Sequence, residues 1–150
     1  MAARAGAGRR SAPIRRYMTR NPVTIASRRS LAEAHRLMRR SGFRHLPVVE
    51  EDRLVGIVSL RDLHLLQTLR DVDPERITVQ EAMTAGPYAV HPGTPIDCVV
   101  REMAEHKWGS AIVAEEGRVL GVFTTTDALR LLARLLVSPP AGRRRSVPDA

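Results

Sequence analysis

The spacing of apolar residues between positions 17 and 69 changes several times, and each spacing predicts one short element. Residues 23–25 follow a proline and predict a brief extended segment. Residues 45–49 and 54–58 are rich in Val, Ile and Leu and predict two strands, because the polar residues 50–53 between them are typical of a tight turn. The two strands are therefore expected to pair as a hairpin.

Helical spacing predicts two helices around that hairpin. The first begins at Ser30, because Ser30 and Glu33 are spaced as a capping box, in which both side chains satisfy free backbone N–H groups. It ends near Gly42, a residue type that terminates helices easily. The second helix is expected over residues 60–69, which gives the order βαββα. The apolar face of the first helix consists of Leu31, Ala34, Leu37 and Met38.

The same pattern returns 65 residues further along the chain, so that Met18 falls on Met83 and Asp62 on Asp127. In the second copy, Thr94 is expected to cap a helix whose first residue is Pro95. Residues 110–114 and 119–123 predict the second strand pair, and residues 125–137 predict the last helix. One copy is too small to bury its own sheet and helices, so the two copies are expected to share a core.

The charge of the chain changes this picture only at its ends. The formal net charge is +8, but residues 1–16 contain five arginines and no acidic residue, and residues 141–150 contain three arginines and one aspartate. The sequence therefore predicts disordered basic tails at 1–16 and 139–150, around motifs at 17–77 and 78–138. Such tails bind polyanions weakly, so weak nucleic-acid binding is an alternative function, although the nearly neutral middle disfavours it.

Several classes of protein are disfavoured by what the sequence lacks. Its apolar runs are far below the roughly 20 residues that span a bilayer, and no apolar stretch follows the first arginines, so a cytoplasmic protein without membrane contact is expected. Cys98 is the only cysteine and is expected to be a small buried apolar residue. The five histidines show no ligand spacing and predict no metal site. No catalytic motif is present, which predicts that the chain is not an enzyme.

The repeated pattern resembles the CBS domain, named after cystathionine beta-synthase, in a tandem pair. Met-Thr-x-x-Pro opens each copy, at Met18 and at Met83, and a capped helix follows. Residues 44–49 (RHLPVV) and 54–62 (LVGIVSLRD) resemble the core strands and the helix start of the family, and residues 119–127 (VLGVFTTTD) repeat the latter. The resemblance covers residues 17–137. It implies an α/β (α+β) fold of two βαββα motifs packed sheet to sheet about a pseudo-two-fold axis.

The resemblance also implies a regulatory function. CBS pairs form a cleft on each side of the pseudo-axis, where many bind AMP, ADP, ATP or S-adenosylmethionine, and no further cofactor is expected. They commonly dimerise, so a homodimer is expected, and occupancy of the cleft would be relayed to a separate effector protein. A scaffold that only dimerises and binds no ligand is the alternative that this resemblance leaves open.

Asp62 and Asp127 are the leading candidates for ligand contact. The resemblance implies that such an Asp accepts hydrogen bonds from both ribose hydroxyls, and an ionised carboxylate offers two acceptors to two donors. Ser59 and Thr124, three residues earlier, lie where a hydroxyl and a helix N-terminus meet a phosphate. Ser-x-x-Asp and Thr-x-x-Asp are also ordinary capping sequences, so a purely structural function is the alternative.

The resemblance divides the remaining candidates between two clefts. The first is expected to combine Asp62 and Ser59 with two basic residues and with residues 86–90 of the other copy. The second is expected to combine Asp127 and Thr124 with residues 21–25. We expect the first cleft to be the main site, because the second copy has uncharged residues in place of the two basic ones. The further candidates are Arg44, His45, Tyr88 and Trp108 for the first cleft, and Thr24, Ile25 and Phe43 for the second. Phe43 and Trp108 either stack on a purine or only pack against the cleft.

Overall fold

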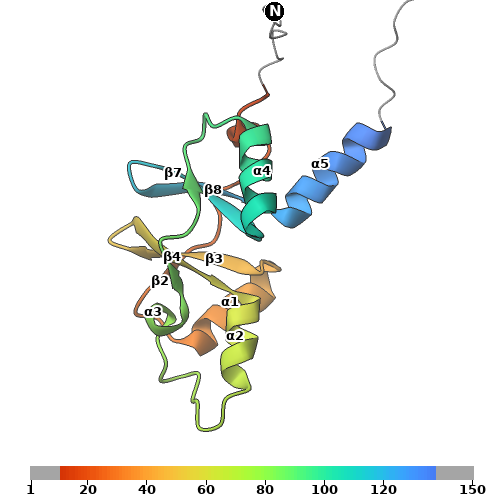
Figure 1. Cartoon of the computed structure of the whole chain (residues 1–150). Coiled ribbons are helices and arrows are strands. Elements are labelled where there is room, and N and C mark those ends of the chain that lie inside the picture. The colour runs from red at the N-terminus through yellow and green to blue at the C-terminus, as the bar shows by residue number, and fades with distance from the viewer. Residues whose placement is uncertain (1–10, 138–150) are drawn as a thin grey trace, which may run out of the picture.

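The computed structural model describes residues 11–137, which form two motifs that lie one above the other (Figure 1). The first half contains η1 (Ile14–Arg16), β1 (Thr19–Arg20), β2 (Ile25–Ala26), α1 (Leu31–Ser41), β3 (His45–Glu50), β4 (Arg53–Ser59) and α2 (Leu60–Gln67). The second half contains α3 (Val79–Ala82), β5 (Thr84–Ala85), β6 (Ala89–Val90), α4 (Ile96–His106), β7 (Ser110–Glu115), β8 (Arg118–Thr124) and α5 (Thr125–Val137). The predicted α/β fold of two packed motifs is confirmed.

Each motif has a four-stranded sheet, and one strand of each sheet comes from the other half of the chain. The sheets have the orders β2-β3-β4-β5 and β1-β8-β7-β6. Thr19 of β1 pairs with Val122 of β8, and Thr84 of β5 pairs with Ile57 of β4. These two pairs are equivalent in the repeat, so the exchange of strands follows the approximate two-fold axis. The axis predicted from the sequence is therefore present in the strand register.

The segments before β1 and β5 also cross to the other motif. Ile14 is fully buried in the core of the second motif, and its N–H donates to the Thr94 carbonyl over 2.8 Å. Val79 is fully buried in the core of the first motif, and its N–H donates to the Arg29 carbonyl over 2.8 Å. Ile14 and Val79 each come from one half of the chain and are buried in the core of the other. Their burial therefore holds the two motifs together through the hydrophobic effect.

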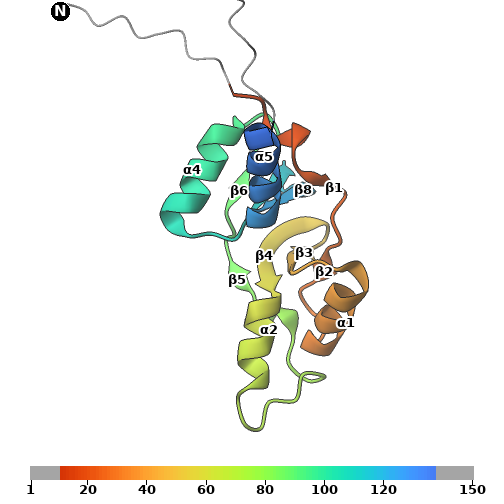
Figure 2. The same cartoon turned by 90° about the vertical axis from the view of Figure 1, so that its right-hand side faces the viewer.

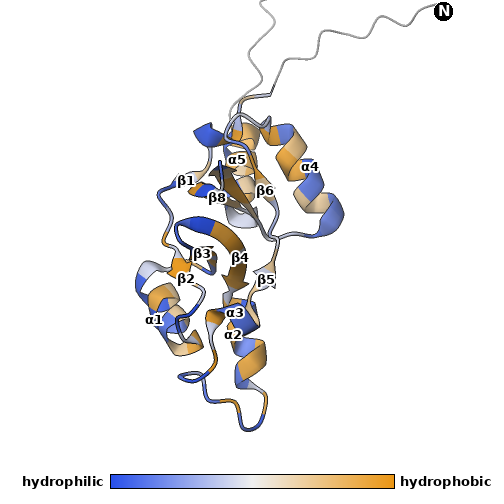
Figure 3. Cartoon of the chain, turned by 90° about the vertical axis from the view of Figure 1, so that its left-hand side faces the viewer, coloured by the Kyte–Doolittle hydropathy of each residue, from blue (hydrophilic) through white to orange (hydrophobic). Residues whose placement is uncertain are grey.

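The sheets meet through β4 and β8. The Leu54 N–H, at the start of β4, donates to the Gly117 carbonyl over 2.9 Å, which joins the hairpin turns of the two motifs. Apolar residues dominate β4 and β8, whereas polar residues cover much of α1 and α4 (Figure 3). This is the distribution expected when two half-covered sheets bury their inner faces against one another.

The two helix pairs differ. In the first motif α1 and α2 pack together, and Leu63 of α2 is buried. In the second motif α5 has no buried residue, and only Ala128 and Leu131 pack partly against the core. Its C-terminal end extends away from the sheets in Figure 1, so that the helix faces the viewer in Figure 2. The exposed apolar residues of α5 are Leu129, Leu132, Leu135, Leu136 and Val137. Among the described residues, no helix combines the length and the apolar character needed to cross a membrane.

The structure corrects several sequence predictions. Residues 11–16 are part of the fold, since Ile14 is a core residue, whereas residues 1–10 and 138–150 of the predicted tails lie outside the described residues. Helix α4 begins at Ile96 with Pro95 at the N-cap and no side-chain capping bond, so Thr94 is not the cap. Cys98 is exposed, because the buried face of α4 is formed by Ile96, Val99 and Met103. The exchanged strands β1 and β5 were not predicted, since two residues are too few to show a period.

Candidate functional site

A cavity of about 530 Å³ lies where the two motifs meet. One wall comes from the end of β8 and the first turn of α5, including Thr124 and Asp127. The opposite wall comes from the first motif, from Pro22 before β2 and from residues 42–45 between α1 and β3, whereas Thr19 of β1 lines the cavity beside its strand partner Val122. Both halves of the chain must therefore be folded and docked for this cavity to exist.

The first turn of α5 fixes the Asp127 carboxylate at the edge of the cavity. Its Oδ2 accepts hydrogen bonds from the Thr124 N–H and from the Thr124 hydroxyl, both at 2.9 Å. Its Oδ1 lies 3.6 Å from Nη1 of Arg130, and the Asp127 side chain is only 18% exposed. The Oδ2 atom thus serves the helix cap, whereas Oδ1 has one distant partner and remains a free acceptor for a ligand hydroxyl.

The first motif contributes positive charge to the same cavity. Gly42 ends α1 in the left-handed conformation, with φ of 73°, and this turn directs the chain into β3 past Phe43, Arg44 and His45. All four residues line the cavity. The cavity thus has the Arg44 residue on one wall and the carboxylate of Asp127 with the nearby Arg130 on the other, which suits a ligand with both hydroxyl and phosphate groups.

His45 lies close to both halves of the site. It pairs with Ser59 across the β3–β4 ladder, and its Nε2 lies 3.3 Å from the position that a Cβ on Gly109 would occupy. Burial lowers the pKa of His45 below its ordinary value; the nearby Asp62 carboxylate opposes this shift, and the Arg44 charge adds to it. His45 is therefore biased towards its neutral form, in which one ring nitrogen accepts a hydrogen bond.

Asp62 has the same local structure as Asp127. Its Oδ2 accepts from the Ser59 N–H at 2.8 Å and from the Ser59 hydroxyl at 2.6 Å, which completes a capping box at the start of α2. The capping function that the sequence left as an alternative is thus present at both aspartates. It leaves one oxygen of each carboxylate outside the cap.

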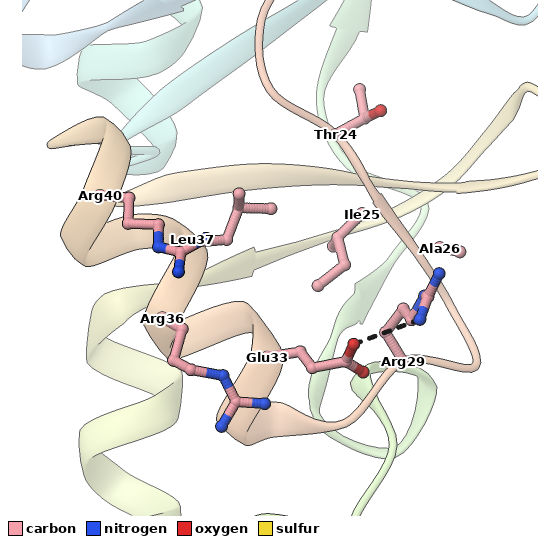
Figure 4. A pocket seen from close by; sticks show the side chains of 8 residues that line it. All are labelled: Thr24, Ile25, Ala26, Arg29, Glu33, Arg36, Leu37 and Arg40. Carbon is pink, nitrogen blue, oxygen red and sulfur yellow. Dashed lines mark hydrogen bonds and ion pairs between the residues drawn. The ribbon is translucent and has the colours of Figure 1, made fainter.

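The structure groups the basic residues differently from the sequence prediction. Arg44 and His45 were assigned to the cleft of Asp62, and both line the cavity of Asp127, although the Asp62 carboxylate is also near enough to His45 to act on its pKa. Thr124, Asp127 and Phe43 lie in one cavity, as expected. Thr24 and Ile25 instead line a neighbouring cavity against α1, shown in Figure 4.

Several lining residues were missed from the sequence. Thr19 belongs to an exchanged strand, and Thr125, Thr126 and Arg130 belong to the first turns of α5. The run of three threonines before Asp127 is a visible signal, since the first copy has Ser59-Leu60-Arg61 there. The start of the last helix is therefore more polar in the second copy than in the first.

The aromatic candidates of the second motif form a stack. The Trp108 ring stacks on Tyr88, with centroids 4.6 Å apart, and on His106, with centroids 4.3 Å apart. Burial raises the pKa of the Tyr88 phenol. Trp108 also lines an apolar groove of about 590 Å³ between α4 and α5. The Trp108 ring is thus already stacked on two side chains of the second half of the chain, which favours packing over purine stacking.

Among residues 11–137, no three His, Cys, Asp or Glu side chains gather closely enough to hold a metal ion. The groups that the Asp127 cavity offers are carboxylate, hydroxyl, guanidinium and imidazole groups. Such a set matches a small polar organic ligand with acidic groups.

The fold and the cavity define a module of two homologous motifs with a polar site at their junction. The chain belongs to the CBS domain family, whose model matches residues 14–66 and 79–134. It is 28% identical over 120 residues to an L-aspartate semialdehyde sulfurtransferase of Methanocaldococcus jannaschii, covering 79% of this chain and 23% of that protein. The chain thus spans less than a quarter of that relative.

Two solved structures cover nearly the same unit. The CBS domain pair of protein MJ0100, in complex with 5′-methylthioadenosine and S-adenosyl-L-methionine, is 26% identical with a TM-score of 0.76, covering 83% of this chain and 98% of that one. The CBS domain of a bacterial CNNM/CorC family Mg²⁺ transporter, in complex with ATP, is 27% identical with a TM-score of 0.71, covering 81% and 87%. Related CBS pairs therefore bind adenosine compounds.

Proposed function

We propose that this chain is a regulatory module that binds an adenosine nucleotide in the Asp127 cavity and catalyses no reaction itself. One observation carries the proposal: the Asp127 carboxylate, of which only one oxygen is bound in the helix cap, lines the same cavity of about 530 Å³ as Arg44 and His45. A volume of this size is typical of small-molecule sites. The adenosine ligands of the two structural relatives support the same class of ligand.

Each wall has a distinct part in this proposal. Asp127 Oδ1 accepts a hydrogen bond from the ribose, since Oδ2 is held by the Thr124 cap. Arg44 and His45 face the phosphate, and a phosphate next to His45 would stabilise the protonated imidazole. Phe43 offers its ring to the purine from the first motif. Asp62 is the pseudo-equivalent group of a second, weaker site.

The test compares two matched variants, Asp127→Asn and Asp62→Asn. Each keeps the size of the side chain and alters one helix cap, so the two should lose similar stability. We expect Asp127→Asn to weaken AMP or ATP binding about 10- to 100-fold by calorimetry, because a charge-assisted hydrogen bond contributes about 1.5–3 kcal/mol. A larger loss in Asp62→Asn would assign the main site to the first cleft.

The same titration separates this function from its rivals. If AMP, ADP, ATP and S-adenosylmethionine all fail to raise the melting temperature, the chain is a scaffold without a nucleotide, since a ligand bound only to the folded state must stabilise it. If binding of nucleic acid is strong, steeply salt-dependent and lost on deletion of residues 1–10 and 138–150, the basic tails carry the function instead.

We also propose that the module is a homodimer whose second-motif helices pair with their copies. Exposed leucines on α5 face an apolar groove against α4, and an apolar surface of this extent is typical of an interface. Glu102 and Glu105 are exposed on α4, whereas Arg130 and Arg134 are exposed on α5. A two-fold contact of α4 with α5 of the second copy would therefore match opposite charges.

This arrangement supplies a route from the ligand to a separate effector. Asp127 lies in the first turn of α5, and the exposed leucines lie further along the same helix. A ligand that holds Asp127 would orient α5 and so change the paired surface. Leu132→Glu is expected to produce monomers in sedimentation experiments. Leu65→Glu, on the exposed face of α2, is the control that should leave the dimer intact.

A further inference from the structure

A second cavity, of about 410 Å³, lies on the first motif and is strongly basic. Arg29, Arg36 and Arg40 line it from α1 and the turn before α1, and Glu33 is its single acidic residue (Figure 4). Ile25 and Leu37 form the apolar part of its wall. Three guanidinium groups around one cavity form a site for a polyanion, because each Arg offers a planar pair of donors to a phosphate.

The three arginines are not equally engaged. Arg29 pairs with Glu33 at 3.2 Å, and Arg36 pairs with Glu75 at 3.0 Å. The side chains of Arg36 and Glu75 are 56% and 61% exposed, so this pair is weak. Arg40 forms no ion pair with any carboxylate of residues 11–137. Arg40 is therefore available to an incoming anion, and Arg36 exchanges its partner at little cost.

This cavity adjoins the Asp127 cavity on two sides. Pro22 lines the Asp127 cavity and Thr24 lines the arginine cavity, and two residues of extended chain span at most roughly 7 Å. On the other side, Arg40 lines the arginine cavity and Gly42 lines the Asp127 cavity. The two cavities thus lie next to each other across residues 22–24 and across the C-terminal end of α1.

We propose that the arginine cavity binds the terminal phosphates of a nucleotide whose adenosine occupies the Asp127 cavity, so that the module prefers a nucleoside triphosphate to a monophosphate. The inference rests on the proposed function. The α-phosphate lies near Arg44, and the chain of phosphates passes the end of α1 to Arg40 and Arg36. Each added phosphate brings negative charge towards guanidinium groups that no monophosphate reaches.

The test measures AMP and ATP binding by calorimetry without Mg²⁺, so that the phosphates keep their full charge. We expect the wild-type chain to bind ATP at least about tenfold more tightly than AMP. The double variant Arg36→Gln/Arg40→Gln should lose most of this preference while its AMP affinity stays unchanged. Arg39→Gln is the matched control, because Arg39 is exposed on the same helix and does not line the cavity.

A second variant tests the partner exchange of Arg36. Glu75→Gln removes the carboxylate that competes with phosphate, so ATP affinity should rise about two- to fivefold and AMP affinity should not change. Equal ATP and AMP affinities in the wild-type chain, or an unchanged preference in the double variant, would overturn the inference. Failure of both nucleotides to bind would instead overturn the proposed function. Pyrophosphate alone should bind weakly and in competition with ATP; binding without competition would place a free anion, not a nucleotide, in this cavity.

Discussion

The side chain of Met18, from the first half of the chain, packs directly on Gly121 of β8 in the second motif. A Cβ added to Gly121 would lie 2.8 Å from Cγ of Met18 and 2.9 Å from the Thr19 carbonyl oxygen. Met83 and Gly56 repeat this contact, with 3.0 Å to Cγ of Met83 and 3.0 Å to the Thr84 carbonyl oxygen. Glycine at both positions therefore allows the exchanged strands to approach their sheets.

Gly121→Ala is expected to destabilise the protein by about 1–3 kcal/mol, the usual cost of overpacking in a close contact. The measurement is the free energy of unfolding from urea titration. Adding Met18→Ala should restore only part of the loss, because the Thr19 carbonyl oxygen stays close. A neutral Gly121→Ala variant would show that β1 does not lie against β8 in solution.

Ser30→Ala and Thr94→Ala should differ, although the sequence predicts both residues as helix caps. Ser30 accepts a hydrogen bond from the Glu33 N–H, so its loss should cost about 0.5–2 kcal/mol. Thr94 precedes an N-cap that has no side-chain bond, so its loss should cost far less. Equal losses in thermal unfolding would contradict the helix start at Ile96.

Folding stability should fall between neutral and mildly acidic pH because of His45. Its pKa is lowered in the folded state, chiefly by burial, so the unfolded chain takes up a proton at a higher pH than the folded chain does. The unfolded state then binds more protons, and stability is lost as the pH falls below about 6.5. The slope from one group is at most about 1.4 kcal/mol per pH unit.

His45→Gln isolates this contribution. The variant should show a flatter dependence of the unfolding free energy on pH between 7.5 and 5.5 (flatter by about one proton at most). Identical slopes in the two proteins would show that His45 takes up its proton equally in both states. In the presence of a nucleotide the wild-type slope should decrease, because a phosphate favours the protonated ring.

Cys98 should react with a thiol reagent in the monomeric Leu132→Glu variant at a rate comparable to that of the urea-unfolded chain. The residue is exposed on α4, and thiol reactivity depends on exposure and thiolate fraction. Cys98 shares a helix face with Glu102 and Glu105, so the proposed dimer contact should protect it in the wild-type chain. Equal rates in the wild-type chain and in the variant would contradict that contact.

Most of the fold was predictable because each sequence pattern that predicts an element occurs twice in the chain. Met18 and Met83 open the two copies, and the capping box at Ser30 and the left-handed end at Gly42 appear where the sequence places them. The hairpins were predicted from runs rich in Val, Ile and Leu on either side of a polar turn, and their registers are equivalent in the two motifs. Such patterns involve residues close together in the sequence, so they can be recognised without knowledge of the tertiary structure.

The candidate site was predicted only in part, because the missing information is tertiary. Asp127, Thr124 and Phe43 were grouped correctly, but Arg44 was placed with Asp62. The residues that face one another across a cavity depend on how the two halves dock, and no local pattern encodes that. Cys98 was predicted to be buried because its neighbours are apolar, whereas α4 buries Ile96, Val99 and Met103 and leaves Cys98 exposed. Sequence periodicity predicts which residues share one face of a helix. It does not predict which of those faces another element covers.

The burial of Ile14 and Val79, each in the opposite motif, bears on how such a chain arises. An isolated half would have an empty place in its core and an open sheet edge, so it would not be stable as a monomer. A single unit could fill that place only with the leading segment of a second copy, so two separate units would have to exchange these segments. Covalent linkage makes the exchange intramolecular, and it needs no second molecule.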